Sequence, residues 1–313
     1  MNVLSTGISL CPLLLLLFTV PLFGQSTAGK NDDFKLTVSV DLVGVLATVT
    51  TTEGALVTGL RQEHFQVYED GQLQDIALFA READQPLRLC LLFDSSASIA
   101  TELKTQQEAA IDFLHSVIRP IDRVSIFQVS EDVQQLQKFS GRLPALERAI
   151  RSIKPGGGTS LYDAIFLAAE SLSSQEGRKV IVVISDGTDT TSGVSLNQCL
   201  RKAQDSEAVA YALVVQPIKS EPGRNLAGEH AMIFLTERTG GRFFKIASAE
   251  SLSSSYVSIG DELRTQYYLA YYPKRTPASQ EFHRIEVRVA NPTHRVRARE
   301  GYSSSSQPPK PNP

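Results

Sequence analysis

The sequence predicts an α/β fold with a doubly wound, mostly parallel sheet, accompanied by a β-sandwich built from the N- and C-terminal flanks. Apolar segments of strand length alternate with helical patterns over residues 86–265, which is typical of βαβ units. Residues 31–84 and 266–302 carry strand patterns without helices. Because neither flank is large enough to bury a good core alone, we expect the two flanks to pack together as one sandwich.

Length and composition are ordinary for a globular protein. The 313 residues are enough for one large or two modest domains. Hydrophobic residues make up 42% of the chain and charged residues 21%. The net charge is −3, so basic residues are not in excess. The composition therefore does not favour a nucleic-acid or anionic-membrane partner.

The first 24 residues resemble a secretory signal peptide. Residues 13–18 are all apolar, within a mostly apolar stretch over residues 8–23, and cleavage is expected near Gly24-Gln25. This core is too short for a comfortable membrane span. No Lys or Arg precedes it, and an uncleaved anchor is the alternative. We expect no stable membrane span after removal of this segment, and a protein that is secreted, periplasmic or located at the cell surface.

Removal of residues 1–24 would leave two cysteines, Cys90 and Cys199. Two cysteines do not make a disulfide framework. Cys90 lies in a predicted buried strand and Cys199 in a predicted helix. These positions favour free, buried thiols, although the spacing is compatible with a single bridge.

The N-terminal flank has the period of two that marks half-buried strands. Residues 34–42 alternate, and the alternation shifts by one over residues 43–49, which predicts a bulge or a change of sheet near residues 42–44. A turn is expected at Glu53-Gly54. The segment Glu69-Asp70-Gly71-Gln72 has the chemistry of a hairpin turn, with residues 76–79 as the expected return strand.

The central region alternates between strand and helix patterns. In the helix patterns, apolar residues recur at spacings of three, four and seven. The C-terminal flank is strand-like again, and the Ser/Pro-rich residues 303–313 have too little apolar surface to fold. The strands expected from the first central strand onward cover residues 87–93, 124–129, 180–184, 209–215, 243–246, 267–272, 282–289 and 294–299, and the helices cover residues 103–117, 143–153, 161–172, 196–204, 227–239 and 252–263.

The first central strand is followed by Asp94, Ser96 and Ser98 at alternate positions. The carboxylate supplies an anionic oxygen and each hydroxyl a neutral one, and Mg²⁺ binds such oxygen ligands while keeping several waters. A loop that leaves the carboxyl end of a central strand is also where open α/β sheets bind their ligands. This segment therefore predicts metal-dependent binding.

Two later segments can meet the first one. Residues 156–158 are glycines, which can fold tightly against another loop, and Thr159 follows them at a predicted helix start. Asp186 follows a later apolar strand. Because parallel strands present their carboxyl ends at one edge, Asp94 and Asp186 can meet there beside Thr159. Considered alone, Thr159 or Ser160 would be interpreted as a helix N-cap. An Asp at a strand end would be interpreted as a turn residue. The three segments together favour a shared metal site.

The order Asp-x-Ser-x-Ser, then a glycine-preceded Thr, then Asp-Gly resembles the metal-ion-dependent adhesion site of von Willebrand factor type A domains, which have a Rossmann-like fold. The resemblance runs from about residue 88 to residue 265. The flanking segments EDGQLQDI, QYYLAYYP and VRAREGY resemble those of secreted bacterial VWFA-related proteins of unassigned role.

The resemblance implies a role for each residue at a matching position. Ser96 and Ser98 would bind Mg²⁺, or Mn²⁺ in its place, directly. Thr159 would bind directly in a ligand-competent state, and Asp94 and Asp186 would act directly or through water. One coordination position stays open in this family for a Glu or Asp of a protein partner. The resemblance therefore implies a secreted, non-enzymatic binding or adhesion module with no catalytic residue. Two further acids near the motif are expected as outer groups or helix caps: Asp163 and Asp189.

Two alternatives remain open. A metal-dependent hydrolase or phosphatase would also place an Asp after the first strand, but the phosphatase pattern has a second Asp where this chain has Ser96. The sequence contains no Gly-x-Ser-x-Gly, no His-Glu-x-x-His and no Gly-x-Gly-x-x-Gly after the first strand. The other alternative is a structural scaffold with an inactive site.

Overall fold

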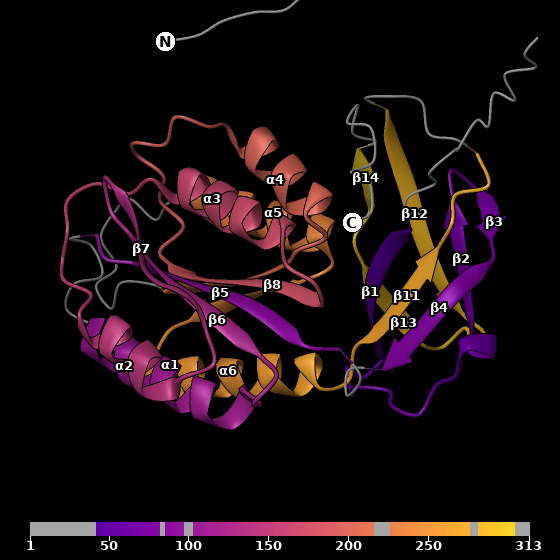
Figure 1. Ribbon diagram of the computed structural model, residues 1–313, viewed down its shortest axis with the longest axis horizontal. Coiled ribbons are helices and arrows are strands. Elements are labelled where there is room, and N and C mark those ends of the chain that lie inside the picture. The colour runs from indigo at the N-terminus through magenta and orange to yellow at the C-terminus, as the bar shows by residue number, and fades with distance from the viewer. Residues whose placement is uncertain (1–41, 82–84, 97–102, 216–225, 276–280, 304–313) are drawn as a thin grey trace, which may run out of the picture. The chain divides into compact units, whose positions relative to one another are not determined.

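The structure, a computed structural model, describes residues 42–81, 85–96, 103–215, 226–275 and 281–303 (Figure 1). The expected signal peptide, the expected first strand apart from Leu42, and the tail beyond residue 303 lie outside these ranges, as does Ser98. In the described part of the chain, no helix is both long enough and apolar enough to cross a membrane.

A six-stranded sheet forms the centre of the α/β part, in the order β10-β9-β8-β5-β6-β7. Neighbouring strands from β10 to β6 are parallel, and β7 pairs antiparallel with β6 at the edge. This arrangement confirms the predicted mostly parallel sheet. Its strands are β5 (Leu87–Asp94), β6 (Arg123–Val129), β7 (Val133–Ser140), β8 (Arg178–Ser185), β9 (Val209–Val215) and β10 (Arg242–Ile246).

Helices cover both faces of this sheet (Figure 1). Successive residues of β5 point to opposite faces, so Leu89 and Leu91 pack in one buried cluster with α1, α2 and α6. Cys90 and Leu92 pack in another cluster with α3, α4 and α5. Cys90 and Cys199 are buried and free, as expected. The helices are α1 (Leu103–Val117), α2 (Leu143–Arg151), α3 (Leu161–Ser173), α4 (Leu196–Asp205), α5 (Leu226–Thr239) and α6 (Ala249–Leu263).

Two four-stranded sheets, β13-β1-β11-β4 and β14-β12-β2-β3, form the second part. Each sheet combines strands from both ends of the chain, because β1 pairs with β11 and β13, and β2 pairs with β12, all antiparallel. Val45, Val67, Leu269 and Ile285 share one buried cluster between the sheets. The sandwich predicted from the two flanks is therefore confirmed. Its strands are β1 (Val43–Thr50), β2 (Phe65–Glu69), β3 (Gln72–Gln74), β4 (Ile76–Arg81), β11 (Tyr267–Tyr271), β12 (Phe282–Val289), β13 (Arg295–Ala298) and β14 (Gly301–Ser303).

The hairpin after β2 differs from the prediction in its return strand. Asp70 and Gly71 form the expected tight turn, with positive φ angles of 49° and 79°. The strand that returns from this turn to pair with β2 is β3, however, and the chain then crosses to the other sheet as β4, where it pairs with β11. The prediction of residues 76–79 as the return strand was wrong because alternation marks a strand but does not specify its partner.

Besides β3, two strands have no counterpart among the predicted elements. All residues of β7 are partly or fully exposed, as is usual for an edge strand, so its sequence has little apolar signal. β14 has only three residues. Strands this short and this exposed are formed by pairing with a neighbour rather than by their own pattern.

Contacts also join the sandwich to the α/β part. Leu46 of β1 and Tyr268 of β11 pack against the cluster beneath α1 and α6. Glu262 of α6 is buried, and its carboxylate accepts hydrogen bonds from the Tyr211 hydroxyl at 3.1 Å and from the guanidinium of Arg297 in β13. Residues 39–313 form one unit by their contacts, so the expected domain boundaries near residues 85 and 266 stay predictions.

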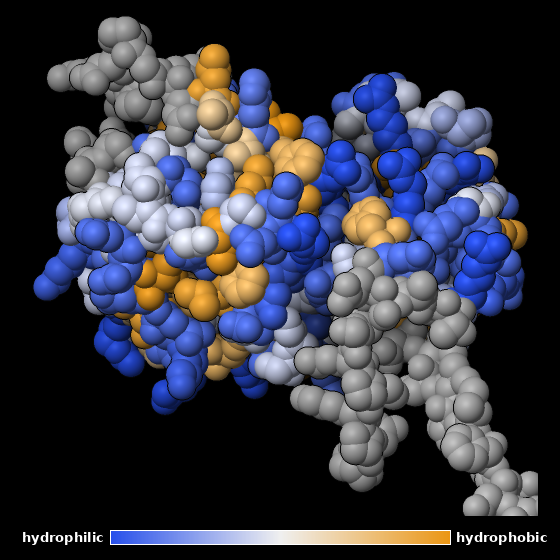
Figure 2. All heavy atoms as spheres, turned by 90° about the horizontal axis from the view of Figure 1, so that it is seen from above, coloured by the Kyte–Doolittle hydropathy of each residue, from blue (hydrophilic) through white to orange (hydrophobic). Residues whose placement is uncertain are grey.

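The surface over one helical layer is partly apolar. Figure 2 looks onto α3, α4 and α5 and shows apolar residues gathered among polar ones. Leu167 of α3 and Leu226 of α5 are 41% and 53% exposed. Exposed apolar side chains are common on globular proteins, so this face by itself indicates no binding site.

Candidate functional site

The carboxyl ends of β5 and β8 lie side by side at one edge of the central sheet. The two strands are parallel neighbours, with Phe93 opposite Ile184. Asp94 and Ser185 therefore end neighbouring strands, and Asp186 follows directly. As predicted, the two acidic strand ends meet at the same edge.

Asp94 is fully buried, and both of its carboxylate oxygens are held. The Ser185 hydroxyl donates to Oδ2 at 2.6 Å, and the backbone N–H of Ser96 donates to Oδ1 at 2.8 Å. The Ser185 oxygen in turn accepts from the backbone N–H of Gly187 at 3.0 Å. This chain of hydrogen bonds fixes the orientation of the carboxylate and connects the loop after β5 to the loop after β8.

The electrostatic environment of Asp94 is unfavourable for a negative charge. Burial is the largest cause that raises the pKa of Asp94, and the negative charge of Asp186 raises it further. The hydrogen bonds from Ser185 and Ser96 oppose these effects. Among the described residues, no lysine or arginine forms an ion pair with Asp94, so a cation near its carboxylate would relieve the cost of burying the charge.

The glycine segment packs against the loop after β5. The backbone N–H of Gly156 donates to the Ser95 carbonyl at 2.6 Å. A Cβ atom on Gly156 would lie 2.7 Å from the Cβ of Ser130, whereas one on Gly157 would meet no atom closer than Glu131 Oε2 at 3.8 Å. The close approach expected of the three glycines therefore depends most on Gly156. A Cβ atom on Gly158 would also be tight, 3.1 Å from Thr191 Cγ2, whereas Gly157 is open.

Thr159 joins the glycine segment to the loop after β8. Its backbone N–H donates to the Thr190 hydroxyl oxygen at 2.9 Å, and its carbonyl accepts from the backbone N–H of Thr190 at 2.8 Å. Thr159 is 2% exposed. These reciprocal bonds hold Thr159 at the start of α3, next to the segment that carries Asp186.

Asp189, rather than Thr159 or Ser160, caps helix α3. Ser160 occupies the N-cap position but makes no capping bond with its side chain. The Asp189 Oδ1 atom accepts from the backbone N–H groups of Leu161 at 2.8 Å and Tyr162 at 3.2 Å. The role of Asp189 as a helix cap, which the sequence suggested, is therefore confirmed, and the hydroxyls before α3 are not needed for capping.

Hydrogen bonds thus join the three loops that carry the predicted ligands. Asp94, Ser96, Thr159 and Asp186 lie on these loops, and Ser98 lies outside the described residues. Sequence reasoning missed Ser185 and Thr190, which connect the loops. The only signal for them was the presence of hydroxyl residues beside Asp186 and Asp189, and such residues are common in turns.

The donor set fits a hard divalent cation. The described candidates supply two carboxylates and two hydroxyls, which are oxygen ligands of the kind that Mg²⁺ and Mn²⁺ accept. One carboxylate, Asp94, is buried and already oriented. With few anionic ligands in the set, a bound divalent ion would keep part of its positive charge.

Residues 89–188 match the family model of the von Willebrand factor type A domain. Among solved structures, a von Willebrand factor type A protein from Catenulispora acidiphila is 9% identical, with 86% of this chain and 75% of that chain covered and a TM-score of 0.50. The pilus adhesin SpaC from Lactobacillus rhamnosus GG, in its open conformation, is 10% identical, with 80% and 42% covered and a TM-score of 0.50.

The von Willebrand factor domain of the type V pilus tip protein Mfa5 from Porphyromonas gingivalis is 13% identical, with 56% of this chain and 94% of that chain covered and a TM-score of 0.47. No curated protein matches the sequence. The matches to the Catenulispora and Lactobacillus proteins show a shared fold.

Proposed function

Since the chain contains a von Willebrand factor type A domain, we propose that it is a protein-interaction module that binds Mg²⁺, or Mn²⁺ in its place, and accepts a Glu or Asp of a protein partner at the ion. The proposed ligands are Asp94, Ser96, Ser98, Thr159 and Asp186. One observation carries the proposal: hydrogen bonds between Asp94 and Ser185, Ser95 and Gly156, and Thr159 and Thr190 bring the three motif loops to one edge of the sheet.

Hydrogen bonds within this chain already orient part of the proposed ligand set. Ser185 and the backbone of Ser96 orient the Asp94 carboxylate, and Thr190 holds the backbone of Thr159. When bound, the ion would supply an electrophilic centre that prefers an external carboxylate to water. Because the ligands around it are mostly neutral hydroxyls, its charge would be only partly cancelled.

The interaction role and the location outside the cytoplasm belong to the same proposal. A pilus adhesin is among the proteins that share the fold, which supports binding to another protein. The apolar stretch within residues 8–23 supports export.

A titration of the purified chain with Mg²⁺ and Mn²⁺ tests the proposal, with the melting temperature as the readout. A ligand that binds only the folded state at a hundred times its Kd stabilises it by about 2.7 kcal/mol. We expect this stabilisation in the wild type and in Asp132→Asn, an exposed acid near the same edge. Asp94→Asn should lose it, because the amide keeps the size of the side chain but removes the charge.

A companion measurement addresses the partner. Partners captured on the immobilised chain in Mg²⁺ should be released by a chelator and should not bind Asp94→Asn. The absence of any metal effect on the wild type would contradict the proposal and favour the scaffold. Turnover of a generic aryl phosphate that depends on Asp94 would instead favour a phosphatase.

A further inference from the structure

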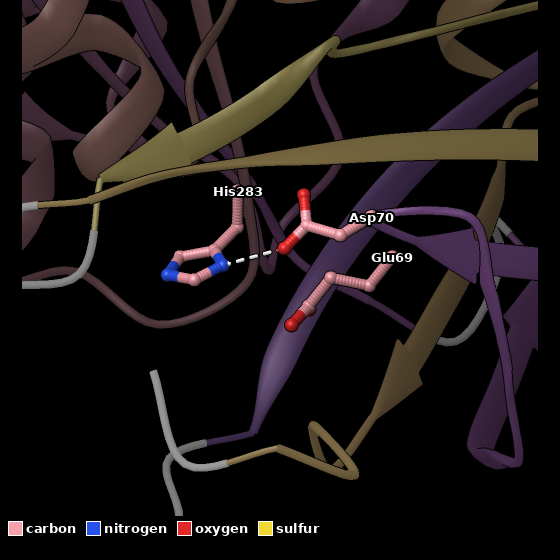
Figure 3. A group of neighbouring side chains, drawn as sticks. All are labelled: Glu69, Asp70 and His283. Carbon is pink, nitrogen blue, oxygen red and sulfur yellow. Dashed lines mark hydrogen bonds and ion pairs between the residues drawn. The ribbon is translucent and has the colours of Figure 1, made fainter. Parts of the chain in front are cut away.

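A second group of metal-ligating side chains lies in the β-sandwich, at Glu69, Asp70 and His283. One ligand atom from each residue lies within 4.8 Å of the other two. Figure 3 shows the Asp70 carboxylate and one nitrogen of the His283 ring turned toward each other, with the Glu69 side chain beside them. Ligand atoms of a single ion bound at about 2.1 Å are separated by at most about 4.2 Å, so small side-chain movements would bring all three onto one ion.

Backbone structure places these residues together. Glu69 ends β2, and Asp70 begins the tight turn with its φ of 49°, a conformation that Asp tolerates better than most residues. β12 pairs with β2 so that Ile285 lies opposite Glu69, and the backbone N–H of Asp70 donates to the Arg284 carbonyl at 2.9 Å. A side chain at position 283 therefore reaches the turn from the neighbouring strand.

Each carboxylate is oriented through one of its two oxygens. The hydroxyls of Tyr271 and Tyr302 donate to Oε2 of Glu69 at 2.6 Å and 3.2 Å. The backbone N–H of Arg284 donates to Oδ1 of Asp70 at 2.9 Å. These bonds do not use Oε1 of Glu69 or Oδ2 of Asp70. Hydrogen bonds of this kind orient metal-binding carboxylates in known sites.

The imidazole of His283 is directed into the same group. The residue is 7% exposed, and its Nδ1 atom lies 2.8 Å from Oδ2 of Asp70. Its other ring nitrogen, Nε2, is buried and has no hydrogen-bond partner among the described residues. Among the described residues, this buried ring therefore makes its polar contact through Nδ1, which faces the Asp70 carboxylate.

These three side chains by themselves carry more negative than positive charge, which the positive charge of Arg275 near Asp70 offsets in part. Glu69 is 5% exposed and forms no ion pair with a lysine or arginine among the described residues. Even with a protonated His283, two carboxylates face one positive ring. Buried charges are normally paired or bound to metal, so a divalent cation would complement this group.

Solvent reaches the carboxylates through a cavity of about 350 Å³, which is lined by Glu69, Asp70, Gln72, Gln74 and Arg275 among others. The cavity gives an ion a path to the carboxylates and leaves space for water at the coordination positions that the protein does not fill. The guanidinium of Arg275 in the same lining would compete with a cation, so it tunes the affinity downward.

We propose that Glu69, Asp70 and His283 form a site for a divalent transition metal ion of the Zn²⁺ type. Mg²⁺ and Ca²⁺ take oxygen ligands, whereas an imidazole together with carboxylates suits Zn²⁺ and its neighbours in the first transition row. The bound ion would join the N-terminal hairpin to the C-terminal strand β12, linking Asp70 and His283 at a sequence separation of 213. It would therefore stabilise the sandwich.

Competition between the full chain, without an affinity tag, and a chromophoric chelator for Zn²⁺ tests this site. We expect the wild type to bind Zn²⁺ with an affinity that His283→Gln and Asp70→Asn each reduce at least about tenfold, since even changes in the groups that orient metal ligands cost about 10–100-fold. Asp75→Asn is the matched control, because Asp75 lies close in sequence and its side chain is 88% exposed. Its affinity should equal that of the wild type.

Asp94→Asn separates this site from the one at the edge of the central sheet. The proposal requires that Asp94→Asn keep the Zn²⁺ that His283→Gln loses. Equal Zn²⁺ affinity in wild type, His283→Gln and Asp70→Asn would overturn it, as would loss of the Zn²⁺ in Asp94→Asn alone. If His283→Gln fails to fold by circular dichroism, Asp70→Asn decides, because the Asp70 side chain is 41% exposed and its amide can still accept from Arg284.

Discussion

The glycine segment allows a matched test of how the site is assembled. In Gly156→Ala, the new Cβ would lie 2.7 Å from the Cβ of Ser130, closer than such atoms approach in proteins, so the loop must shift. The shift would also strain the 2.6 Å hydrogen bond from the Gly156 N–H to the Ser95 carbonyl. In Gly157→Ala, the nearest atom would be 3.8 Å away, at the flexible end of Glu131.

The two variants share one effect and differ in another. Alanine reduces the entropy of the unfolded chain to a similar extent at either position, so this effect cancels in the difference between Gly156→Ala and Gly157→Ala. The remaining difference is the cost of overpacking, about 1–3 kcal/mol in the free energy of unfolding. At about 2–4 °C per kcal/mol for a chain of this size, Gly156→Ala should melt about 2–12 °C below Gly157→Ala.

Thermal and urea unfolding of the full chain, followed by far-ultraviolet circular dichroism, measure this difference directly. The test does not depend on whether an ion binds, since both variants can be compared in the presence of a chelator. Equal melting temperatures for Gly156→Ala and Gly157→Ala would refute the argument that the close approach at Gly156 holds the loop against Ser95.

Two further predictions concern the interior and the helix beside the site. Asp189→Ala should lower the free energy of unfolding by about 0.5–2 kcal/mol, because α3 loses the acceptor for two N–H groups. Asp189→Asn should lose less in the same urea titration, and equal losses would argue against the capping role. Burial raises the pKa of Cys90 from 9.0 to about 12, so the thiol stays protonated in the folded chain while it ionises in the unfolded one. The contribution of Cys90 to the free energy of unfolding should therefore fall as pH rises from about 9 to 12, by about 1.4 kcal/mol per pH unit. Urea titrations of Cys90→Ala should show a shallower fall than those of the wild type.

Much of the fold follows from local pattern. The continuous apolar runs of β5, β8 and β9 predict buried parallel strands, and the observed strands β9 and β12 have the expected bounds. The Asp70-Gly71 turn follows from residue type, since both residues adopt positive φ. The edge strand β7 and the pairing of β4 with β11 could not be predicted, because they depend on neighbours distant in sequence rather than on the local alternation of residues.

The candidate site divides in the same way. The positions of Asp94 and Asp186 after two apolar strands predict their meeting at one edge, since parallel strands must end on the same side. The hydroxyls of Ser185 and Thr190, which tie the loops together, could not be singled out. Hydroxyl residues occur in many turns, and only the folded loops show which of them meet a partner.

The sequence by itself determined the alternation of the central parallel strands with helices, the apolar faces that bury them and the oxygen-bearing residues at the strand ends, because these depend on periodicity and residue chemistry along a short stretch of chain. Only the tertiary structure decided which of the three glycines are closely packed and that Asp189 caps α3. It also brought His283 to Glu69 and Asp70. Such contacts join residues far apart in sequence, and their distances follow from how the sheets pair and pack.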